Sequence, residues 1–222
     1  MTSEAAEGAR RRWKQNPEAV QEDILRVAVA VFSESGLSGA RIDEIAARTQ
    51  TSKRMIYYYF GDKMGLYMRA LEAAYAKVRA GEDQLDLGTL PPDEALARLV
   101  AFTFDHHRSN PDFIRMVMIE NIHNAETLAA SEVIRNMNVS AIEKLRDICR
   151  RGEAEGLFRQ GLDPVALHWQ ISALSFFNVS NRPTFSALFG EGFFSEEGQK
   201  ALRRQIVDSL LAEVRPRDTP RP

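Results

Sequence analysis

The stretch TSKRMIYYYF, residues Thr51–Phe60, carries the strongest indications of the fold of this chain. A hydroxyl residue precedes two cations, and three tyrosines follow in a row. Such a run of aromatic residues suits a buried β-strand. The sequence on either side instead repeats apolar residues at steps of three and four, which is the period of an α-helix. We therefore expect a short helix here, with Ser52 placed as its N-cap.

Helical spacing divides the three tyrosines between two sides of this helix. The residues of the first side, which can pack against neighbouring helices, are Ile56, Tyr59 and Phe60. The residues of the opposite side are Lys53, Arg54, Tyr57 and Tyr58. Lysine and arginine donate to the acceptors of guanine, and the edge of a tyrosine ring suits a thymine methyl group. The second side therefore has the chemistry of a surface that contacts DNA bases.

The sequence before this helix predicts two more helices. Apolar residues recur between Ile24 and Phe32, and the pattern ends at Gly36, a typical C-terminal stop. Residues 42–46 mark a short second helix, and residues 49–51 break it. Two helices, a tight turn and a third helix form a helix-turn-helix, whose third helix enters the major groove of DNA.

Positive charge is concentrated in this segment, although the whole chain has a net charge of −2. Between Arg41 and Lys63, five cations accompany three acids. Ser52 and Lys63 stand at the starts of two predicted helices, where free N–H groups and the helix dipole favour a phosphate. Binding to DNA therefore depends on a local patch rather than on bulk charge.

The composition is that of a globular protein with a core, since 44% of the residues are hydrophobic and 27% are charged. The sequence has no apolar run near the roughly 18 residues that span a bilayer, and its N-terminus lacks the apolar segment of a secretory signal. The single cysteine, Cys149, excludes an internal disulfide, which fits a reducing compartment. We expect a cytoplasmic protein that spans no membrane and has no metal site and no cofactor.

Helical periodicity continues through most of the chain and predicts an all-α fold with about nine helices. Asp62 and Asp163 are placed to cap two of these helices. One long helix is expected from about residue 126 to residue 152. The last two long helices are expected over residues 163–178 and 195–214, and both carry apolar stripes. We expect residues 1–15 and 215–222 to be disordered because they are short polar termini.

Residues 24–67, ILRVAVAVFSESGLSGARIDEIAARTQTSKRMIYYYFGDKMGLY, resemble the DNA-binding domain of the TetR family of transcriptional regulators. An apolar helix ending in Phe-x-x-x-Gly is followed by Ile-Ala, by Ser-Lys with Tyr-x-Tyr-Phe, and by a lysine three residues later. Several independent elements thus agree in order and spacing. The resemblance implies a helix-turn-helix domain over residues 1–67, a ligand-binding and dimerisation domain over residues 68–222, and a regulator rather than an enzyme.

The resemblance also implies how such a regulator works. We expect a homodimeric repressor that binds a palindromic operator in double-stranded DNA and is released by a small-molecule inducer. Its dimer interface is expected in helices 163–178 and 195–214, although their stripes would equally suit an internal core. The implied base contacts come from Lys53, Arg54, Tyr57 and Tyr58. The implied phosphate contacts come from Ser52, Tyr59 and Lys63.

The sequence departs from the family pattern at three places. Gln50 stands where a glycine is frequent, and a left-handed backbone there would cost about 1 kcal/mol. Ala40-Arg41 replaces a threonine pair, so we expect Arg41 to supply the missing phosphate contact. Arg54-Met55 replaces small residues in the recognition helix. These departures leave the operator sequence open.

An inducer site is expected to be mostly apolar with a few convergent polar groups. Residues 102–123 and 169–182 combine both kinds of side chain. Asn178 and Arg182 stand out because a polar group among apolar helices needs a partner. The full set of candidates is Phe102, His106, Phe113, Met116, His123, Trp169, Phe177, Asn178 and Arg182.

Two other functions stay open at this point. Glu120 and His123 have the i, i+3 spacing of a helical di-metal carboxylate site, and His106 is nearby, so an all-α metalloenzyme is one alternative. The sequence supplies no second Glu-x-x-His pair for it. A regulator controlled by a protein partner is the other alternative. The segment RRRWK, Arg10–Lys14, is either an arm for the minor groove or a solubilising tail.

Overall fold

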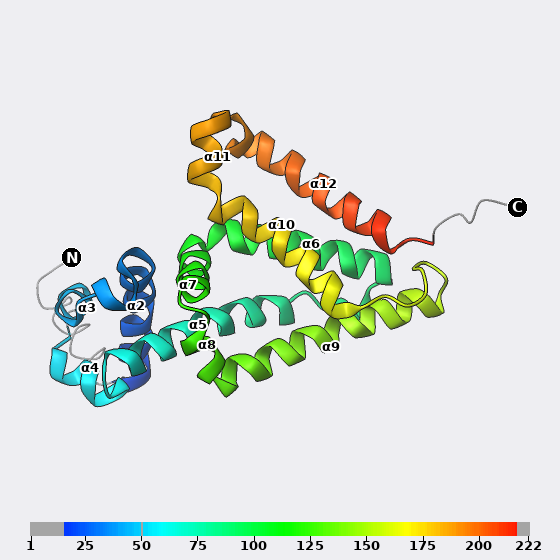
Figure 1. Ribbon diagram of the computed structural model, residues 1–222. Coiled ribbons are helices and arrows are strands. Elements are labelled where there is room, and N and C mark those ends of the chain that lie inside the picture. The colour runs from blue at the N-terminus through cyan, green and yellow to red at the C-terminus, as the bar shows by residue number, and fades with distance from the viewer. Residues whose placement is uncertain (1–15, 50, 217–222) are drawn as a thin grey trace, which may run out of the picture. The chain divides into compact units, whose positions relative to one another are not determined.

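The computed structural model describes residues 16–49 and 51–216, and every regular element within these ranges is helical (Figure 1). The predicted all-α class is confirmed. In chain order the elements are α2 (Pro17–Gly39), α3 (Ile42–Thr49), α4 (Lys53–Phe60), α5 (Lys63–Asp83), η1 (Leu87–Thr89), α6 (Pro92–Ser109), α7 (Pro111–Ile122), α8 (Glu126–Ala130), α9 (Glu132–Ala154), α10 (Pro164–Ser180), α11 (Arg182–Phe189), η2 (Glu191–Phe194) and α12 (Glu196–Val214).

The predicted helix starts are confirmed in atomic detail. The side chains of Ser52, Asp62 and Asp163 each accept a hydrogen bond from a backbone N–H in the first turn that follows, at 3.3, 2.7 and 2.9 Å. Gly36 and Gly61 end helical segments with φ values of 67° and 78°, in the left-handed region that glycine adopts without strain. Local chemistry therefore sets these boundaries.

The expectation of one helix over residues 126–152 is wrong, because Ser131 separates α8 from α9. Ser131 has extended backbone angles, φ −88° and ψ 108°. Its side chain is buried, and its hydroxyl donates a 2.8 Å hydrogen bond to Glu72 on α5. A buried contact with another helix thus overrides the local helical pattern.

Sequence analysis also assigned no helix to the segment that forms α11 and η2. Pro183, Gly190 and Gly192 in this segment are typical of a loop. Pro183 is nevertheless tolerated, because it lies in the first turn of α11, where a backbone N–H has no helical partner.

The chain divides into two compact units. The first unit takes in the described residues up to Ala74 together with Arg115–Ser131, and the second takes in Tyr75–Ile114 and the described residues from Glu132 onward. α5 and α7 each contribute residues to both units.

The core of the first unit is built by α2, α3 and α4 with the first turns of α5. Phe32 of α2 meets Tyr67 of α5 edge to face, with ring centroids 5.0 Å apart. Both rings are buried. The side chains that fill the rest of this core include Ile24, Val31, Ile45, Ile56 and Leu66.

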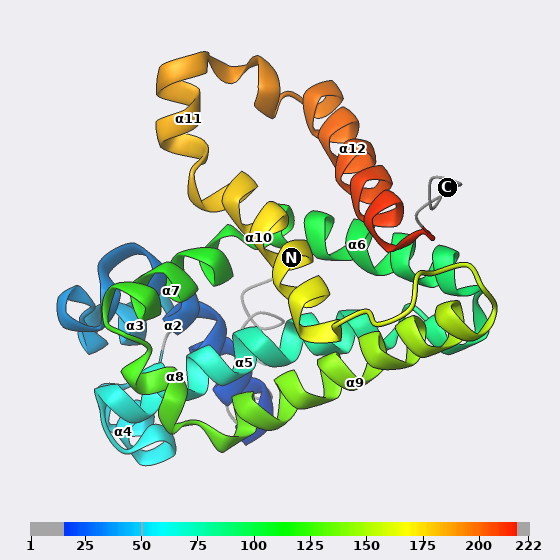
Figure 2. The same ribbon diagram turned by 45° about the vertical axis from the view of Figure 1, so that its right-hand side comes forward.

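The second unit is organised around α6, which packs against α9, α10 and α12. Figure 2 shows α10 and α12 joined at one end through α11. Fifteen buried residues form the core here, among them Phe104, Leu145, Leu167, Ile171 and Ile206. Cys149 belongs to this core, and burial raises the pKa of its thiol to about 11, so it is an inert apolar residue. Among the described residues, no helix is both long and apolar enough to cross a membrane.

Candidate functional site

The helix α4 presents one of its sides to solvent and buries the other. Ile56 and Phe60 are 0% and 8% exposed. On the opposite side Tyr57 and Tyr58 are 44% and 77% exposed, far more than is usual for aromatic rings in a core. Lys53 and Arg54 share this exposed side. The four exposed residues Lys53, Arg54, Tyr57 and Tyr58 form a surface that is called the recognition face below.

Lys53 of the recognition face is engaged in an ion pair. Its Nζ lies 2.5 Å from Oδ1 of Asp43 on α3, and both side chains are about half exposed. Exposed pairs of this kind contribute about 0–1 kcal/mol. Breaking this ion pair therefore costs little free energy.

Three of the residues predicted to contact phosphates lie at helix N-termini. Arg41 immediately precedes α3, Ser52 caps α4, and Lys63 is the first residue of α5. The positive end of the helix dipole is found at each of these places. Lys63 donates a 3.2 Å hydrogen bond to the carbonyl oxygen of Ser38. Three cationic or donor groups are thus placed where an anion is favoured.

Tyr59, the fourth predicted phosphate contact, is half-buried. Its ring packs edge to face against Tyr58 at 5.3 Å and against Phe60 at 6.2 Å. It therefore links the exposed side of α4 to the buried side. Gln50 and the basic segment Arg10–Lys14 lie outside the described residues.

Three of the predicted inducer contacts come together in the second unit. The ring of His106 lies 5.5 Å from that of Phe102 and 6.3 Å from that of Phe113, measured between centroids. Sequence analysis did not select His107 and Tyr75 as inducer contacts, yet their rings lie 5.9 and 5.1 Å from Phe113. An aromatic and imidazole cluster is thus formed by α5, α6 and the start of α7.

The histidines of this cluster are uncharged near neutral pH. Burial, with smaller contributions from His106 and Arg79, lowers the pKa of His107 to about 4. Burial is also the main cause that lowers the pKa values of His106 and His168. Each ring therefore offers both a hydrogen-bond donor and an acceptor.

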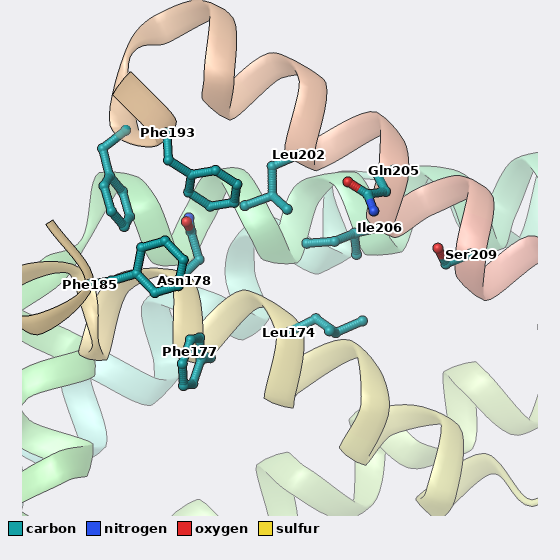
Figure 3. A pocket seen from close by; sticks show the side chains of 10 residues that line it. Leu174, Phe177, Asn178, Phe185, Phe193, Leu202, Gln205, Ile206 and Ser209 are labelled. Carbon is teal, nitrogen blue, oxygen red and sulfur yellow. The ribbon is translucent and has the colours of Figure 1, made fainter. Parts of the chain in front are cut away.

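Phe177 and Asn178 lie elsewhere in the second unit, in the wall of a cavity of about 310 Å³ between α10 and α12. Figure 3 shows Phe177, Phe185 and Phe193 around one end of this cavity and Leu174 and Ile206 farther along it. Asn178 is held by Gln199 through two hydrogen bonds of 2.8 and 3.0 Å. Its polar groups are therefore satisfied within the protein.

The other predicted inducer contacts are Met116, His123, Trp169 and Arg182. Met116 is fully buried and His123 is exposed, and both belong to the first unit. Trp169 is 70% exposed on α10. Arg182 lies 5.4 Å over the ring of Phe194, and its guanidinium is 3.5 Å from Glu191 on the surface. Trp169 and Arg182 are therefore surface side chains.

The geometry of Glu120 does not suit the metalloenzyme alternative. Its Oε1 accepts a hydrogen bond from Tyr67 at 2.8 Å, and its Oε2 accepts one from the backbone N–H of Leu128 at 2.9 Å. His123 points its Nδ1 to the carbonyl oxygen of Ile119, at 2.9 Å. Within residues 16–49 and 51–216 no three His, Cys, Asp or Glu side chains gather as metal ligands. Glu120 is therefore a structural carboxylate.

Two family models match the sequence. The model for bacterial regulatory proteins of the tetR family covers residues 24–70, and the tetracyclin repressor-like C-terminal domain covers residues 92–210. The chain belongs to the TetR family. This TetR-family protein is accordingly a DNA-binding transcriptional regulator, and its helix-turn-helix consists of α3 and α4.

Two relatives of this TetR-family protein are similar to it along nearly their whole length. The HTH-type transcriptional repressor NicS of Pseudomonas putida is 36% identical over 90% of this chain and 95% of its own. The repressor SCO4008 of Streptomyces coelicolor is 28% identical over 87% of this chain and 97% of its own. A solved tetR-family structure from Rhodococcus RHA1 has a TM-score of 0.69 at 20% identity, over 90% of this chain and 98% of that one. The last comparison supports the fold.

Sequence analysis of this TetR-family protein missed the aromatic cluster of α11 and η2. The rings of Phe185, Phe189 and Phe193 pack at centroid distances of 4.7 and 5.4 Å around Phe185. The high density of phenylalanine in RPTFSALFGEGFF was the available signal. No helical period of several turns accompanies this density, so no element was predicted there.

Proposed function

We propose that this TetR-family protein is a repressor that binds a palindromic operator as a homodimer and is released by a small-molecule inducer. The observation that carries the proposal is the recognition face of α4. Two tyrosines and two cations are held in solvent there by a helix whose other side is anchored in the core. Two exposed tyrosines side by side are unusual on a surface that only contacts solvent, so they indicate a binding surface.

The proposed roles in DNA binding follow from chemistry and position. Lys53 and Arg54 donate to guanine O6 and N7, while Tyr57 and Tyr58 contact thymine methyl groups and base edges. The proposed phosphate contacts, which fix the register of the protein on the duplex, are Arg41, Ser52, Tyr59 and Lys63. Specificity then comes from the first group and salt-dependent affinity from the second.

Homodimer formation through α10 and α12 is supported by the distribution of apolar residues on α10. Leu167 and Ile171 are buried in the core of the second unit. Val165, Trp169 and Phe177 are more than half exposed on the same helix. A helix that is apolar on several sides is usually covered on several sides. A second copy related by a two-fold axis covers this surface and pairs two recognition faces, so the operator is palindromic.

Repression and its relief are proposed on two grounds. NicS and SCO4008 carry the word repressor in their names, and both are similar to this protein over nearly all of its length. The second unit offers the aromatic and imidazole cluster, with Phe102, His106 and Phe113, as the place for an inducer. An inducer that binds one conformation more tightly shifts the population away from the conformation whose recognition faces fit the operator.

Footprinting on the DNA that flanks the protein's own gene tests this function. We expect one protected region with two inverted half-sites whose centres are about 10 base pairs, or a multiple of that, apart. Protection should weaken steeply as salt is raised, because phosphate contacts release counterions. Failure of the intact protein to protect any part of this DNA at modest salt would rule the function out.

A further inference from the structure

Buried polar atoms without a hydrogen-bond partner are concentrated at one place in the second unit. Arg79 Nε, both ring nitrogens of His106, Nδ1 of His107 and Oγ of Ser175 lack any partner. Ser175 is 0% exposed and His107 is 7% exposed. Among the described residues only Ser186 and Arg203 contribute further atoms of this kind. Since native proteins leave few buried polar atoms unpaired, this concentration needs an explanation.

The side chains that carry these atoms are supplied by α5, α6 and α10. The ring centroids of His106 and His107 are 6.3 Å apart. His107 also has a hydrogen bond with the backbone of Ser175. The charge of Arg79 acts on the imidazole rings of both histidines. The side chains of Arg79, His106, His107 and Ser175 are called the polar cluster below.

Aromatic rings stand beside this polar cluster. Phe102 and Phe113 flank His106, and Tyr75 packs on Phe113. Phe102 is held close to α5 by Gly81, where an added Cβ would lie 2.5 Å from the tip of the ring. Flat apolar rings next to unpaired polar atoms suit a planar aromatic molecule with a polar substituent.

The buried charges beside the cluster are balanced, and the other cation that acts on His106, Lys77, is exposed to solvent and hydrogen-bonded to Asn110. Arg79 donates a 2.6 Å hydrogen bond to Glu82, and the two side chains are only 14% and 6% exposed. An anion placed beside Arg79 would also lie near the buried carboxylate of Glu82. A cation placed beside Glu82 would lie near the guanidinium of Arg79. Either ion would lose its hydration without gaining an unshared partner, so the cluster favours an uncharged ligand.

The unpaired atoms also define the hydrogen bonds that the ligand must make. Nε–H of Arg79 requires an acceptor. Nδ1 of a neutral His107, whose other nitrogen is taken up by the backbone of Ser175, requires a donor. His106 requires one of each, and the hydroxyl of Ser175 serves as either. A matching ligand therefore both donates and accepts.

We propose that Arg79, His106, His107 and Ser175 form the inducer site, and that its ligand is an uncharged, planar aromatic molecule bearing an amide or hydroxyl group. The role of this ligand as an inducer rests on the proposed function. The site and its ligand class rest on the polar cluster alone.

Three probes of similar size test the ligand class on the full-length protein. Benzamide is uncharged and both donates and accepts, benzoate is an anion, and toluene is apolar. We expect benzamide to bind at least about tenfold more tightly than the other two in titrations followed by NMR, because only benzamide satisfies the unpaired atoms. Preference for benzoate or toluene would overturn the proposal. Absence of binding by all three would show that water occupies the cluster, and would overturn it too.

A matched pair of serine variants tests the location. Ser175→Ala should weaken benzamide binding about tenfold, since it removes one hydroxyl from the cluster. Ser186→Ala removes an equally unpaired hydroxyl on α11 and should leave benzamide binding unchanged. His106→Phe should abolish benzamide binding and leave the midpoint of thermal unfolding of the ligand-free protein unchanged or raised, because unpaired polar atoms are removed. Equal effects of the two serine variants, or a clear loss of stability in His106→Phe, would overturn the site.

Failure of this proposal is distinguishable from failure of the proposed function. Binding of the operator, located by footprinting, is measured by fluorescence anisotropy with and without benzamide. Site-dependent benzamide binding that leaves operator affinity unchanged would uphold the site and contradict its role in induction. Normal operator binding by a protein that does not bind benzamide would uphold the proposed DNA-binding function and contradict the proposed site.

Discussion

The hydroxyl of Tyr67 donates a 2.8 Å hydrogen bond to Oε1 of Glu120, and both side chains are buried. Burial first, and then the hydrogen bond and charge of Glu120, raise the pKa of Tyr67 well above its usual range. Glu120 also accepts the backbone N–H of Leu128. This carboxylate thus connects α5, α7 and the start of α8 within the unit that contains the helix-turn-helix.

Removal of the Tyr67 hydroxyl tests the contribution of this connection. Tyr67→Phe keeps the ring against Phe32 and leaves the buried Glu120 short of one donor. We expect the free energy of unfolding, measured with urea, to fall by about 1–3 kcal/mol. Tyr58→Phe is the matched control, because it removes the same atom from a ring that is 77% exposed, and it should change stability little. Similar losses in both variants would show that Glu120 gains nothing from Tyr67.

Removal of one recognition-face side chain tests base contacts. Tyr57→Ala should weaken binding to the operator by about tenfold to a hundredfold, equivalent to about 1–3 kcal/mol, while binding to a scrambled duplex of the same length changes little. Fluorescence anisotropy on both duplexes provides the comparison. Lys63→Gln should instead weaken both interactions alike and reduce the slope of log K against log salt by about one. Equal losses on the two duplexes for Tyr57→Ala would refute base recognition by this ring.

A polar substitution on the outer side of α10 tests the dimer interface. Trp169→Ser should convert the dimer to a monomer, because an indole ring that is 70% exposed in one chain would otherwise be buried by the second copy. Sedimentation equilibrium measures the mass, and circular dichroism checks that the helices remain. Leu188→Ser is the control, since this side chain is similarly exposed but lies on α11, outside the two proposed interface helices. A wild-type monomer, or a dimeric Trp169→Ser variant, would contradict the proposed interface.

The buried His107 makes stability depend on pH on the acid side. Its pKa is lowered from 6.5 to about 4 in the folded protein, so the unfolded chain binds its proton first as pH falls. The contribution of this pKa shift to the free energy of unfolding is fully present above pH 6.5. It is lost as pH falls toward about 4, and the total loss is about 3 kcal/mol. Urea unfolding at several pH values between 7 and 4 measures this loss. His107→Phe should show a flatter dependence than the wild type over the same range, and an unchanged slope would contradict a buried neutral imidazole.

The recognition face is the part of the candidate site that sequence analysis predicted best. Ser52 as N-cap and the three- and four-residue spacing fix which side chains of α4 share a side. Ile56 is accordingly buried and Tyr58 exposed. The cap and the spacing act between residues close together in the chain, so the sequence alone was sufficient.

The apolar stripes of α10 and α12 did not indicate whether these helices pack in the core or against a second copy. Leu167, Ile171 and Ile206 lie in the core of the second unit, whereas Trp169 is 70% exposed on α10. An amphipathic pattern shows that one side of a helix is covered and does not show by what. Packing on α6 decided this question, because α6 contacts both helices.

By itself the sequence determined the all-α class, most helix boundaries and the side of α4 that carries tyrosines and cations. These features arise from interactions along one helix, over one or two turns. Only the tertiary structure decided that Glu120 accepts a hydrogen bond from Tyr67, that Ser131 separates two helices, and that His107 is hydrogen-bonded to the backbone of Ser175. The partners in each case are far apart along the chain and become neighbours only when helices pack, so no local pattern encodes their meeting.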